Sequence, residues 1–318
     1  MAACGALLFA ASPSLAQAPP LEVLEPGETG ERITEGGLLG NYYPAGSNDA
    51  PAPAILLVGG SEGGLGQDMT GLSRALQSEG YSVLHLSWWR AEGQPKKIEA
   101  IPIEYFVGAL DWLRAREGVA KDKIAMFGWS RGSEAALLTA MRYPALNAVL
   151  VSMPANAVFP GFWWDGPPMG LGGPFTWRSK EIPNLGLNWM AMMGKPKEDY
   201  AKALISLQEE NPDAVIAIES IEAPVLILCG EEDQLWPSCP MARRAKARAD
   251  AAGKRDVELL ALKDAGHWAV GAPLAPDTPA YARLEMFNVG GSMEGTVEAR
   301  QVSFDRIVAF LEANLNGR

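Results

Sequence analysis

The chain has 318 residues, of which 48% are hydrophobic, and its formal net charge is −11 at pH 7. This length and composition suffice for one large α/β core, with or without an inserted cap. The negative charge and the lack of a basic tract argue against a nucleic-acid partner, because phosphate backbones are bound by clustered lysine and arginine. Two histidines and three cysteines, with no close cysteine pair, leave no plausible zinc site.

The first eighteen residues, 1–18, are apolar, uncharged and end in Ala16-Gln17-Ala18. An A-x-A ending after an apolar run is typical of a signal peptide, here without its basic n-region. We therefore predict a truncated leader and export to a bacterial periplasm or beyond, with residues 19–318 forming a single domain. The alternative is a disordered Ala/Pro tail on a cytoplasmic protein. No other segment reaches the apolar length that a membrane span requires.

Short apolar runs alternate with amphipathic stretches along the rest of the chain. An early antiparallel strand is expected at 38–43, and further strands at 55–58, 83–86, 124–127, 148–151, 224–229 and 257–262. Helical spacing lies between them, for example in the stripe Ile103, Phe106, Val107, Leu110 and Leu113, and again in a last helix containing Phe304, Ile307, Val308 and Leu311. Strands separated by helices predict a mostly parallel central sheet that is covered on both faces.

Residues 154–219 interrupt this alternation, and we interpret them as a cap inserted into the domain. Its apolar residues follow neither a helical nor a strand period. The segment is rich in large apolar side chains: Phe159, Phe162, Trp163, Trp164, Trp177, Trp189, Met190, Met192 and Met193. Broad aromatic faces and adaptable methionines would suit an acyl chain. Packing of the cap on the sheet and on itself explains the same residues equally well.

Gly128-Trp129-Ser130-Arg131-Gly132 spells G-x-S-x-G, between the expected strand at 124–127 and a helical stretch at 133–143. This context is typical of a nucleophile elbow, in which a serine sits on a strained strand-to-helix turn. The flanking glycines are needed because a β-carbon there would collide with the neighbouring strand or helix. We predict Ser130 as the nucleophile.

A serine nucleophile needs a histidine to take its proton and a buried carboxylate to orient the imidazole. In chains of this type the order is nucleophile, acid, histidine. Only His267 lies downstream of Ser130, whereas His85 lies within an apolar strand and is better explained as a hydrogen-bonded core residue. The loop after strand 224–229 offers three adjacent carboxylates, of which Asp233 is our choice and Glu232 the runner-up.

The oxyanion of the tetrahedral intermediate needs two hydrogen-bond donors. The backbone N–H of Arg131, directly after the nucleophile, supplies one. The glycine-rich loop 59–64 follows strand 55–58, and we assign the second donor to the backbone N–H of Ser61 within it. This loop matches neither common nucleotide-binding glycine motif in register, so phosphate binding is the weaker interpretation.

Two of the three cysteines bracket the acid loop. In an oxidising compartment Cys229 and Cys239 could form a disulfide that pins Asp233. Two separate, small buried residues are an equally good interpretation, because the sequence gives no Cα separation.

With these residues in place, the chain from about residue 51 to its end resembles the catalytic domain of the bile acid-CoA:amino acid N-acyltransferase and acyl-CoA thioester hydrolase family, a branch close to the dienelactone hydrolases. The marks of the resemblance are the loop 59–64, Ile103-Glu104-Tyr105-Phe106, the elbow at Ser130, the loop 230–236 and Gly266-His267. The resemblance implies an α/β-hydrolase fold, an acyl-enzyme at Ser130 and no cofactor.

The sequence also departs from that family. Its animal members carry an N-terminal β-sandwich domain, and here only some thirty residues stand between the expected leader and the catalytic core. Members that transfer acyl groups to amino acids typically carry cysteine as the nucleophile, so serine favours hydrolysis. An exported, acidic enzyme is poorly matched to acyl-CoA, although Arg90, Lys96 and Lys97 could form a local basic exception.

The leading hypothesis is therefore a serine hydrolase acting on a small-molecule carboxylic ester or thioester. Acyl transfer from a thioester to an amine or alcohol is the first alternative. A binding protein that has kept the fold without activity is the second, since fold alone does not establish function. The acyl chain, the leaving group and the oligomeric state are left open by the sequence.

Overall fold

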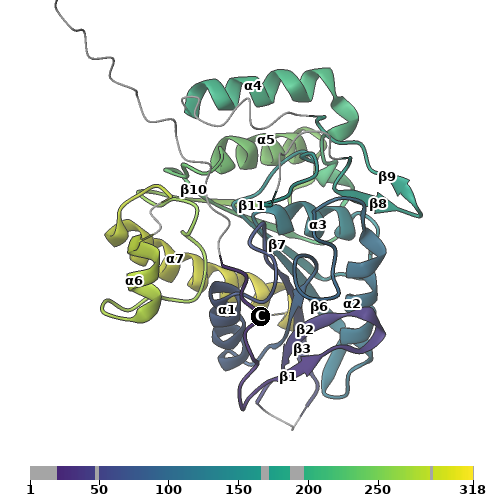
Figure 1. Ribbon diagram of the computed structural model, residues 1–318, viewed down its shortest axis with the longest axis vertical. Helices are drawn as coiled ribbons and strands as arrows, with labels where there is room; N and C mark the ends of the chain where they lie inside the picture. Colours follow the sequence, from purple (N-terminus) through teal and green to yellow (C-terminus); the bar gives the residue numbers. More distant parts are fainter. Residues whose placement is uncertain (1–19, 47–49, 166–171, 187–196, 287–288, 318) are drawn as a thin grey trace, which may run out of the picture.

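The computed structural model describes residues 20–46, 50–165, 172–186, 197–286 and 289–317 (Figure 1). The predicted leader at 1–18 lies outside this part of the chain. Eight strands form the central sheet in the order β1-β2-β4-β3-β6-β7-β10-β11. The first two are antiparallel edge strands and the remaining neighbours pair in parallel. The strand bounds are β1 Glu31–Ile33, β2 Leu39–Tyr43, β3 Ala52–Val58, β4 Ser82–Ser87, β6 Val119–Trp129, β7 Ala148–Ser152, β10 Val225–Gly230 and β11 Val257–Leu262.

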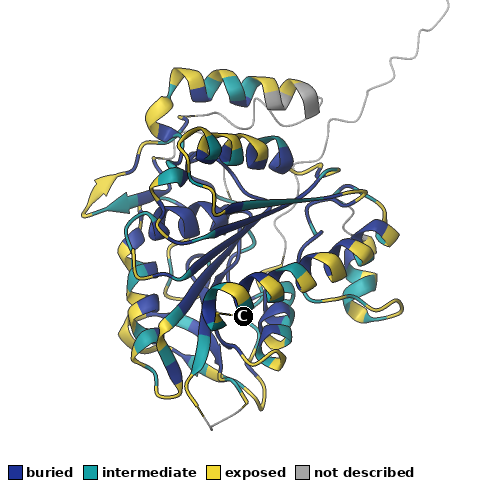
Figure 2. Cartoon of the chain, turned by 180° about the vertical axis from the view of Figure 1, so that it is seen from behind, coloured by how far each residue is buried: buried dark blue, intermediate teal, exposed yellow. Residues whose placement is uncertain are grey.

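Helices cover both faces of this sheet, as Figure 2 shows with the buried strands between two helical layers. The helices are α1 Gln67–Ser78, α2 Ile103–Ala115, α3 Arg131–Ala140, α4 Lys197–Glu210, α5 Ser238–Ala251, α6 Pro279–Met286 and α7 Met293–Leu311. Side chains of α1 and α7 pack with one set of strand residues, and those of α2, α3 and α5 pack with the other. The predicted, mostly parallel sheet with helices on both faces is therefore confirmed.

The central strand β3 shows why the sheet is buried on both sides. Successive strand residues point to opposite faces. Leu56 and Val58 join the α2, α3 and α5 side, whereas Ile55 and Leu57 join the α1 and α7 side, and all four are 0% exposed. A continuous apolar run, rather than an alternating one, is what a parallel strand between two helical layers requires.

The segment between β7 and β10 is where the alternation was expected to stop, and it holds two strands of a small sheet and the helix α4. The small sheet joins β5 Ile101–Pro102, β8 Phe175–Trp177 and β9 Lys180–Glu181. A separate apolar cluster ties this segment to the loop after β10, since Phe159, Leu185 and Leu204 pack together with Trp236 and Met241. The cap residues at 166–171 and 187–196, among them Trp189, Met190, Met192 and Met193, lie outside the described residues.

Several elements differ from the sequence expectation, among them β6 and α5. Strand β6 begins at Val119, five residues before the apolar run that signalled it, because its first half is a partly exposed extension. Helix α5 was not predicted. Its buried positions are mostly small residues such as Ala242, Ala245 and Ala249, so it shows no large apolar stripe.

Candidate active site

The candidate site lies at one edge of the sheet, where four parallel strands end. Ser61 follows β3, Ser130 follows β6, Asp233 follows β10 and His267 follows β11. The carboxyl ends of parallel strands share one edge, and loops from that edge commonly build binding sites in open α/β sheets. The topology therefore brings together residues that are up to 206 positions apart in the chain, counted from Ser61 to His267.

The turn at Ser130 has the backbone conformation that an elbow requires. Its φ is +52° and its ψ −121°, a region that residues with side chains rarely adopt, and α3 starts at the next residue. A β-carbon at Gly128 would lie 2.2 Å from the carbonyl oxygen of Gly132 in the following helix. One at Gly132 would lie 2.4 Å from the carbonyl oxygen of Gly59 after β3. Both glycines are thus required by close backbone approach.

Ser130, His267 and Asp233 form one continuous hydrogen-bonded chain. His267 Nε2 lies 3.0 Å from Ser130 Oγ, and His267 Nδ1 lies 2.8 Å from Asp233 Oδ2. The side chains are buried, with Ser130 4% exposed and the other two 1%. A neutral imidazole with its hydrogen on Nδ1 donates to the carboxylate and accepts the serine hydroxyl hydrogen, which is the arrangement that prepares a serine for attack.

Asp233 is held in place by four hydrogen bonds. Its Oδ1 accepts from the backbone N–H groups of Leu235 at 2.9 Å and Trp236 at 3.3 Å, and its Oδ2 accepts from Ser238 Oγ at 2.7 Å as well as from His267. These donors satisfy the buried carboxylate oxygens and fix their position. The runner-up Glu232, by contrast, is exposed.

Ser61 and Arg131, the two residues assigned to the oxyanion, both line a cavity beside Ser130. The loop that carries Ser61 runs directly against the elbow, because a β-carbon at Gly60 would lie 2.8 Å from Cβ of Ser130. Arg131 is the first residue of the ten-residue helix α3. The helix N-terminus adds a favourable dipole where negative charge would develop.

Two further carboxyl groups lie close to this site. Glu62 accepts a hydrogen bond from the backbone N–H of Gly60, and burial raises its pKa from 4.5 to about 7. Glu134 in α3 is 0% exposed, pairs with Arg131 at 2.9 Å, and accepts from the backbone N–H of Phe159 at 3.3 Å. Burial raises its pKa to about 7 as well, opposed by the neighbouring guanidinium. Neither carboxyl group was predictable from the sequence pattern.

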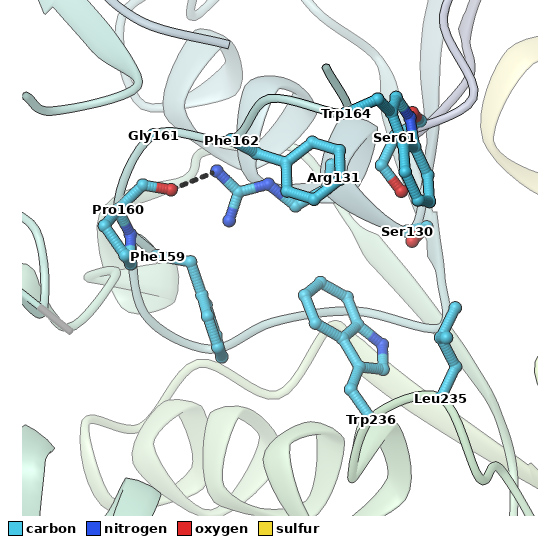
Figure 3. A pocket seen from close by; sticks show the side chains of 10 residues that line it. All are labelled: Ser61, Ser130, Arg131, Phe159, Pro160, Gly161, Phe162, Trp164, Leu235 and Trp236. Carbon is cyan, nitrogen blue, oxygen red and sulfur yellow. Dashed lines mark hydrogen bonds between the residues drawn. The ribbon is translucent and has the colours of Figure 1, made fainter. Parts of the chain in front are cut away.

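The cavity beside Ser130 has a volume of about 90 Å³ and is walled mainly by aromatic rings (Figure 3). Of the cap residues expected to contact an acyl chain, Phe159, Phe162 and Trp164 line it, together with Trp236 and Leu235 from the acid loop. Trp163 and Trp177 lie elsewhere and contact cations instead. Lys97 Nζ lies 4.7 Å from the ring of Trp163, and Trp177 lies beside Arg142 and Arg178.

The acid loop is closed by a disulfide. Cys229 near the end of β10 is bonded to Cys239 in the first turn of α5, with their Cα atoms 5.1 Å apart. The nine residues between them include Asp233, Trp236 and Ser238. This resolves the two interpretations of the cysteine pair in favour of a bond.

The other singled-out residues take structural positions. His85 in β4 is 1% exposed, lies 3.5 Å from Thr70 Oγ1 through its Nδ1, and has its pKa lowered to about 3 by burial. Arg90 donates to the carbonyl oxygen of Glu62 at 3.0 Å, and Lys97 lies 3.9 Å from Glu99.

Within the described residues, no three His, Cys, Asp or Glu side chains gather in a way that could hold a metal ion. In the same part of the chain, no helix is long and apolar enough to span a membrane.

Residues 101–317 match the family model described as BAAT / Acyl-CoA thioester hydrolase C terminal. The chain belongs to this family. The resemblance noted from the motifs is thereby confirmed.

Curated relatives agree with this membership. Acyl-coenzyme A thioesterase 6 of Homo sapiens is 25% identical over 309 residues, which cover 93% of this chain and 68% of that protein. Acyl-coenzyme A thioesterase 1 of Homo sapiens is 26% identical over 249 residues, which cover 77% of this chain and 55% of the relative. The chain thus spans only about half to two thirds of the length of these proteins.

Among solved structures, one from Klebsiella pneumoniae whose name assigns it to the dienelactone hydrolases is similar, with a TM-score of 0.56 and 17% identity. The likeness covers 89% of this chain and 96% of that one. At this identity it shows the fold alone, and it confirms the predicted α/β-hydrolase fold.

Proposed function

We propose that the chain is a serine hydrolase that cleaves a carboxylic ester or thioester through an acyl-enzyme at Ser130. The observation that supports this most directly is the buried hydrogen-bonded chain from Ser130 through His267 to Asp233. Relatives named acyl-coenzyme A thioesterases favour a thioester among the substrates. The hydrolase domain in this proposal spans 19–318, with the cap at 154–219.

The proposed reaction has two halves. Ser130 Oγ attacks the substrate carbonyl carbon while His267 Nε2 takes the hydroxyl hydrogen, and Asp233 stabilises the resulting imidazolium. The backbone N–H groups of Ser61 and Arg131 bind the oxyanion. The imidazolium then protonates the departing alcohol or thiol. Water attacks the acyl-enzyme in the second half, with His267 again as the base, and releases the acid.

A fluorophosphonate probe tests the nucleophile. We expect the intact protein to gain the mass of one adduct, located on Ser130, and the Ser130→Ala variant to gain none. Hydrolysis of p-nitrophenyl esters and acyl-CoA thioesters, with Ser130→Ala as the blank, identifies the leaving group. If the protein gains no adduct and cleaves neither substrate type, the chain is better explained as a binding protein that has kept the fold.

Acyl transfer is separated from hydrolysis by adding an acceptor. The serine nucleophile favours hydrolysis, so we expect the free acid to remain the product when glycine or a simple alcohol is added at increasing concentration. Formation of an amide or ester in proportion to the acceptor would instead show a transferase.

We also propose that the protein is exported to an oxidising compartment through a leader at 1–18. The bond between Cys229 and Cys239 supports this, because disulfides persist mainly in such compartments. Fractionation of the native host should place the protein outside the cytosol, with its N-terminus following Ala18. A cytosolic, uncleaved protein would contradict export and leave the hydrolase proposal unaffected.

A further inference from the structure

The cavity beside Ser130 is small and its walls are rings that meet edge to face or at a tilt. The ring centroids of Phe159 and Trp236 are 5.2 Å apart, and those of Phe162 and Trp164 are 4.8 Å apart. Figure 3 shows the two pairs on opposite sides of the space in front of Ser130. Phe159, Phe162 and Trp236 are each at most 9% exposed, so they are packed from behind as well as facing the cavity.

Hydrogen bonds hold both tryptophan rings in place. The indole N–H of Trp164 donates to the carbonyl oxygen of Ser61 at 2.5 Å, and that of Trp236 donates to the carbonyl oxygen of Met153 at 3.0 Å. Withdrawing the Trp236 ring would leave a buried polar group without its partner, and withdrawing the partly buried Trp164 ring would break its hydrogen bond to Ser61. These two walls are therefore preorganised rather than adaptable.

The backbone behind Phe159 is tied to the helix that follows the nucleophile. Glu134 Oε2 accepts from the backbone N–H of Phe159, and Arg131 Nη2 donates to the carbonyl oxygen of Pro160 at 2.9 Å. Arg131 and Glu134 also pair with each other at 2.9 Å. The guanidinium in the wall thus already has a carboxyl partner in Glu134 and a carbonyl partner in Pro160, which leaves it poorly placed to bind a charged acyl group.

We propose that the acyl group of the substrate is short and uncharged, of about four carbon atoms or fewer. This rests on the proposed hydrolase function. A cavity of roughly 150 Å³ in another protein holds benzene, with six carbons, so one of about 90 Å³ holds correspondingly less. Leu235 lines the cavity and is 52% exposed, so this side borders solvent, and we assign the leaving group to it. A longer acyl chain then has to displace the leaving group or the hydrogen-bonded rings of Trp164 and Trp236.

The test is a series of p-nitrophenyl esters with acetyl, butyryl, octanoyl, palmitoyl and benzoyl groups, compared by kcat/KM. We expect acetyl or butyryl to be cleaved fastest and octanoyl at least 10-fold more slowly, since a fixed pocket discriminates by 10-fold or more for each methylene that does not fit. Octanoyl, palmitoyl or benzoyl esters cleaved as fast as butyryl would overturn the size limit. If an ester with a negatively charged, succinyl-type acyl group were cleaved faster than the butyryl ester, the proposal that the acyl group is uncharged would be overturned.

Phe159→Ala should widen the cavity and raise octanoyl cleavage relative to butyryl by at least 10-fold. Trp177→Ala is the matched control, because it removes a cap aromatic that does not line the cavity, and its acyl preference should equal that of the wild type. Phe159→Leu serves if the alanine variant does not fold, with a smaller shift in the same direction. Unchanged acyl preference in a folded Phe159 variant would contradict the assignment of this wall.

The size limit and the proposed function fail in different ways. A Ser130 adduct with fluorophosphonate, together with preference for long chains, overturns the size limit alone. Absence of both the adduct and any ester or thioester cleavage overturns both.

Discussion

Ser238 donates its hydroxyl hydrogen to Oδ2 of Asp233 at 2.7 Å, the same carboxylate oxygen that His267 contacts. The serine lies in the first turn of α5, immediately before the disulfide-bonded Cys239, and is 0% exposed. Asp233 Oδ2 is therefore oriented by Ser238 as well as by the imidazole. Ser238 is in this view a positioning residue for the acid.

Ser238→Ala should lower kcat by about 5-fold with little change in KM, because one buried hydrogen bond contributes roughly 1 kcal/mol. Ser73→Ala is a matched control, since Ser73 is also fully buried but bonds the carbonyl oxygen of Met69 in α1. Steady-state kinetics on both variants decide the matter. An unaltered kcat for Ser238→Ala would show that the backbone N–H groups alone orient the carboxylate.

Asp233→Asn should retain the fold and reduce kcat by about 10³- to 10⁴-fold, because an amide favours the wrong imidazole tautomer and cannot stabilise the imidazolium. The neighbouring, exposed Glu232 provides the control, and Glu232→Gln should be close to wild type. Circular dichroism establishes folding and ester hydrolysis gives the rate. A larger loss for the Glu232 variant would reverse the choice between the two acids.

The residues of the candidate site differ in how well the sequence predicts them. The elbow was predictable because a short motif stood between an apolar run and a helical stretch, and His267 because the chain has only one histidine downstream. Asp233 was separable from Glu232 only by its place in the turn, and the structure shows the two side chains facing opposite environments. Ser238 was not predictable, since nothing in the sequence distinguishes it from any serine at the start of a helix.

The cap and the disulfide mark the limit in a different way. The segment expected to form a cap has no regular hydrophobic period. Its aromatic residues could be named from the sequence, but the pattern could not separate Phe159, which lines the cavity, from Trp177, which does not. Predicting the bond between Cys229 and Cys239 requires the distance between their Cα atoms, which only the fold provides. In both cases the missing information is tertiary distance, which local patterns do not contain.

Replacing both Cys229 and Cys239 by alanine should lower the free energy of unfolding by about 3 kcal/mol, as expected for a cross-link that closes a ten-residue interval. Urea denaturation measures this difference. Because the interval contains Asp233, we also expect the variant to lose activity at urea concentrations below its global unfolding midpoint. Coincident loss of activity and fluorescence signal would show that the acid loop has no separate dependence on the bond.

Glu62 gives a prediction about pH. Its folded pKa of about 7 lies above its ordinary 4.5, so the native state holds this proton more tightly than the unfolded state. Ionising Glu62 in the folded protein therefore lowers the free energy of unfolding. This loss is absent below pH 4.5, grows as the pH rises, and is complete above about pH 7. Relative to wild type, Glu62→Gln should therefore gain stability between pH 5 and 8, by up to about 3 kcal/mol. Urea denaturation of both proteins at pH 5 and pH 8 measures the difference in their free energies of unfolding. The same difference at both pH values would contradict the prediction.

The positive φ of Ser130 is flanked by close backbone approach at Gly128 and Gly132, and these approaches do not involve the serine hydroxyl. They would be the same with sulfur in place of the hydroxyl oxygen. Exchanging the hydroxyl for a thiol would change the chemistry of the attacking atom while leaving the turn as it is. One backbone can in this way serve two kinds of nucleophile, and the choice between them is made by a single atom.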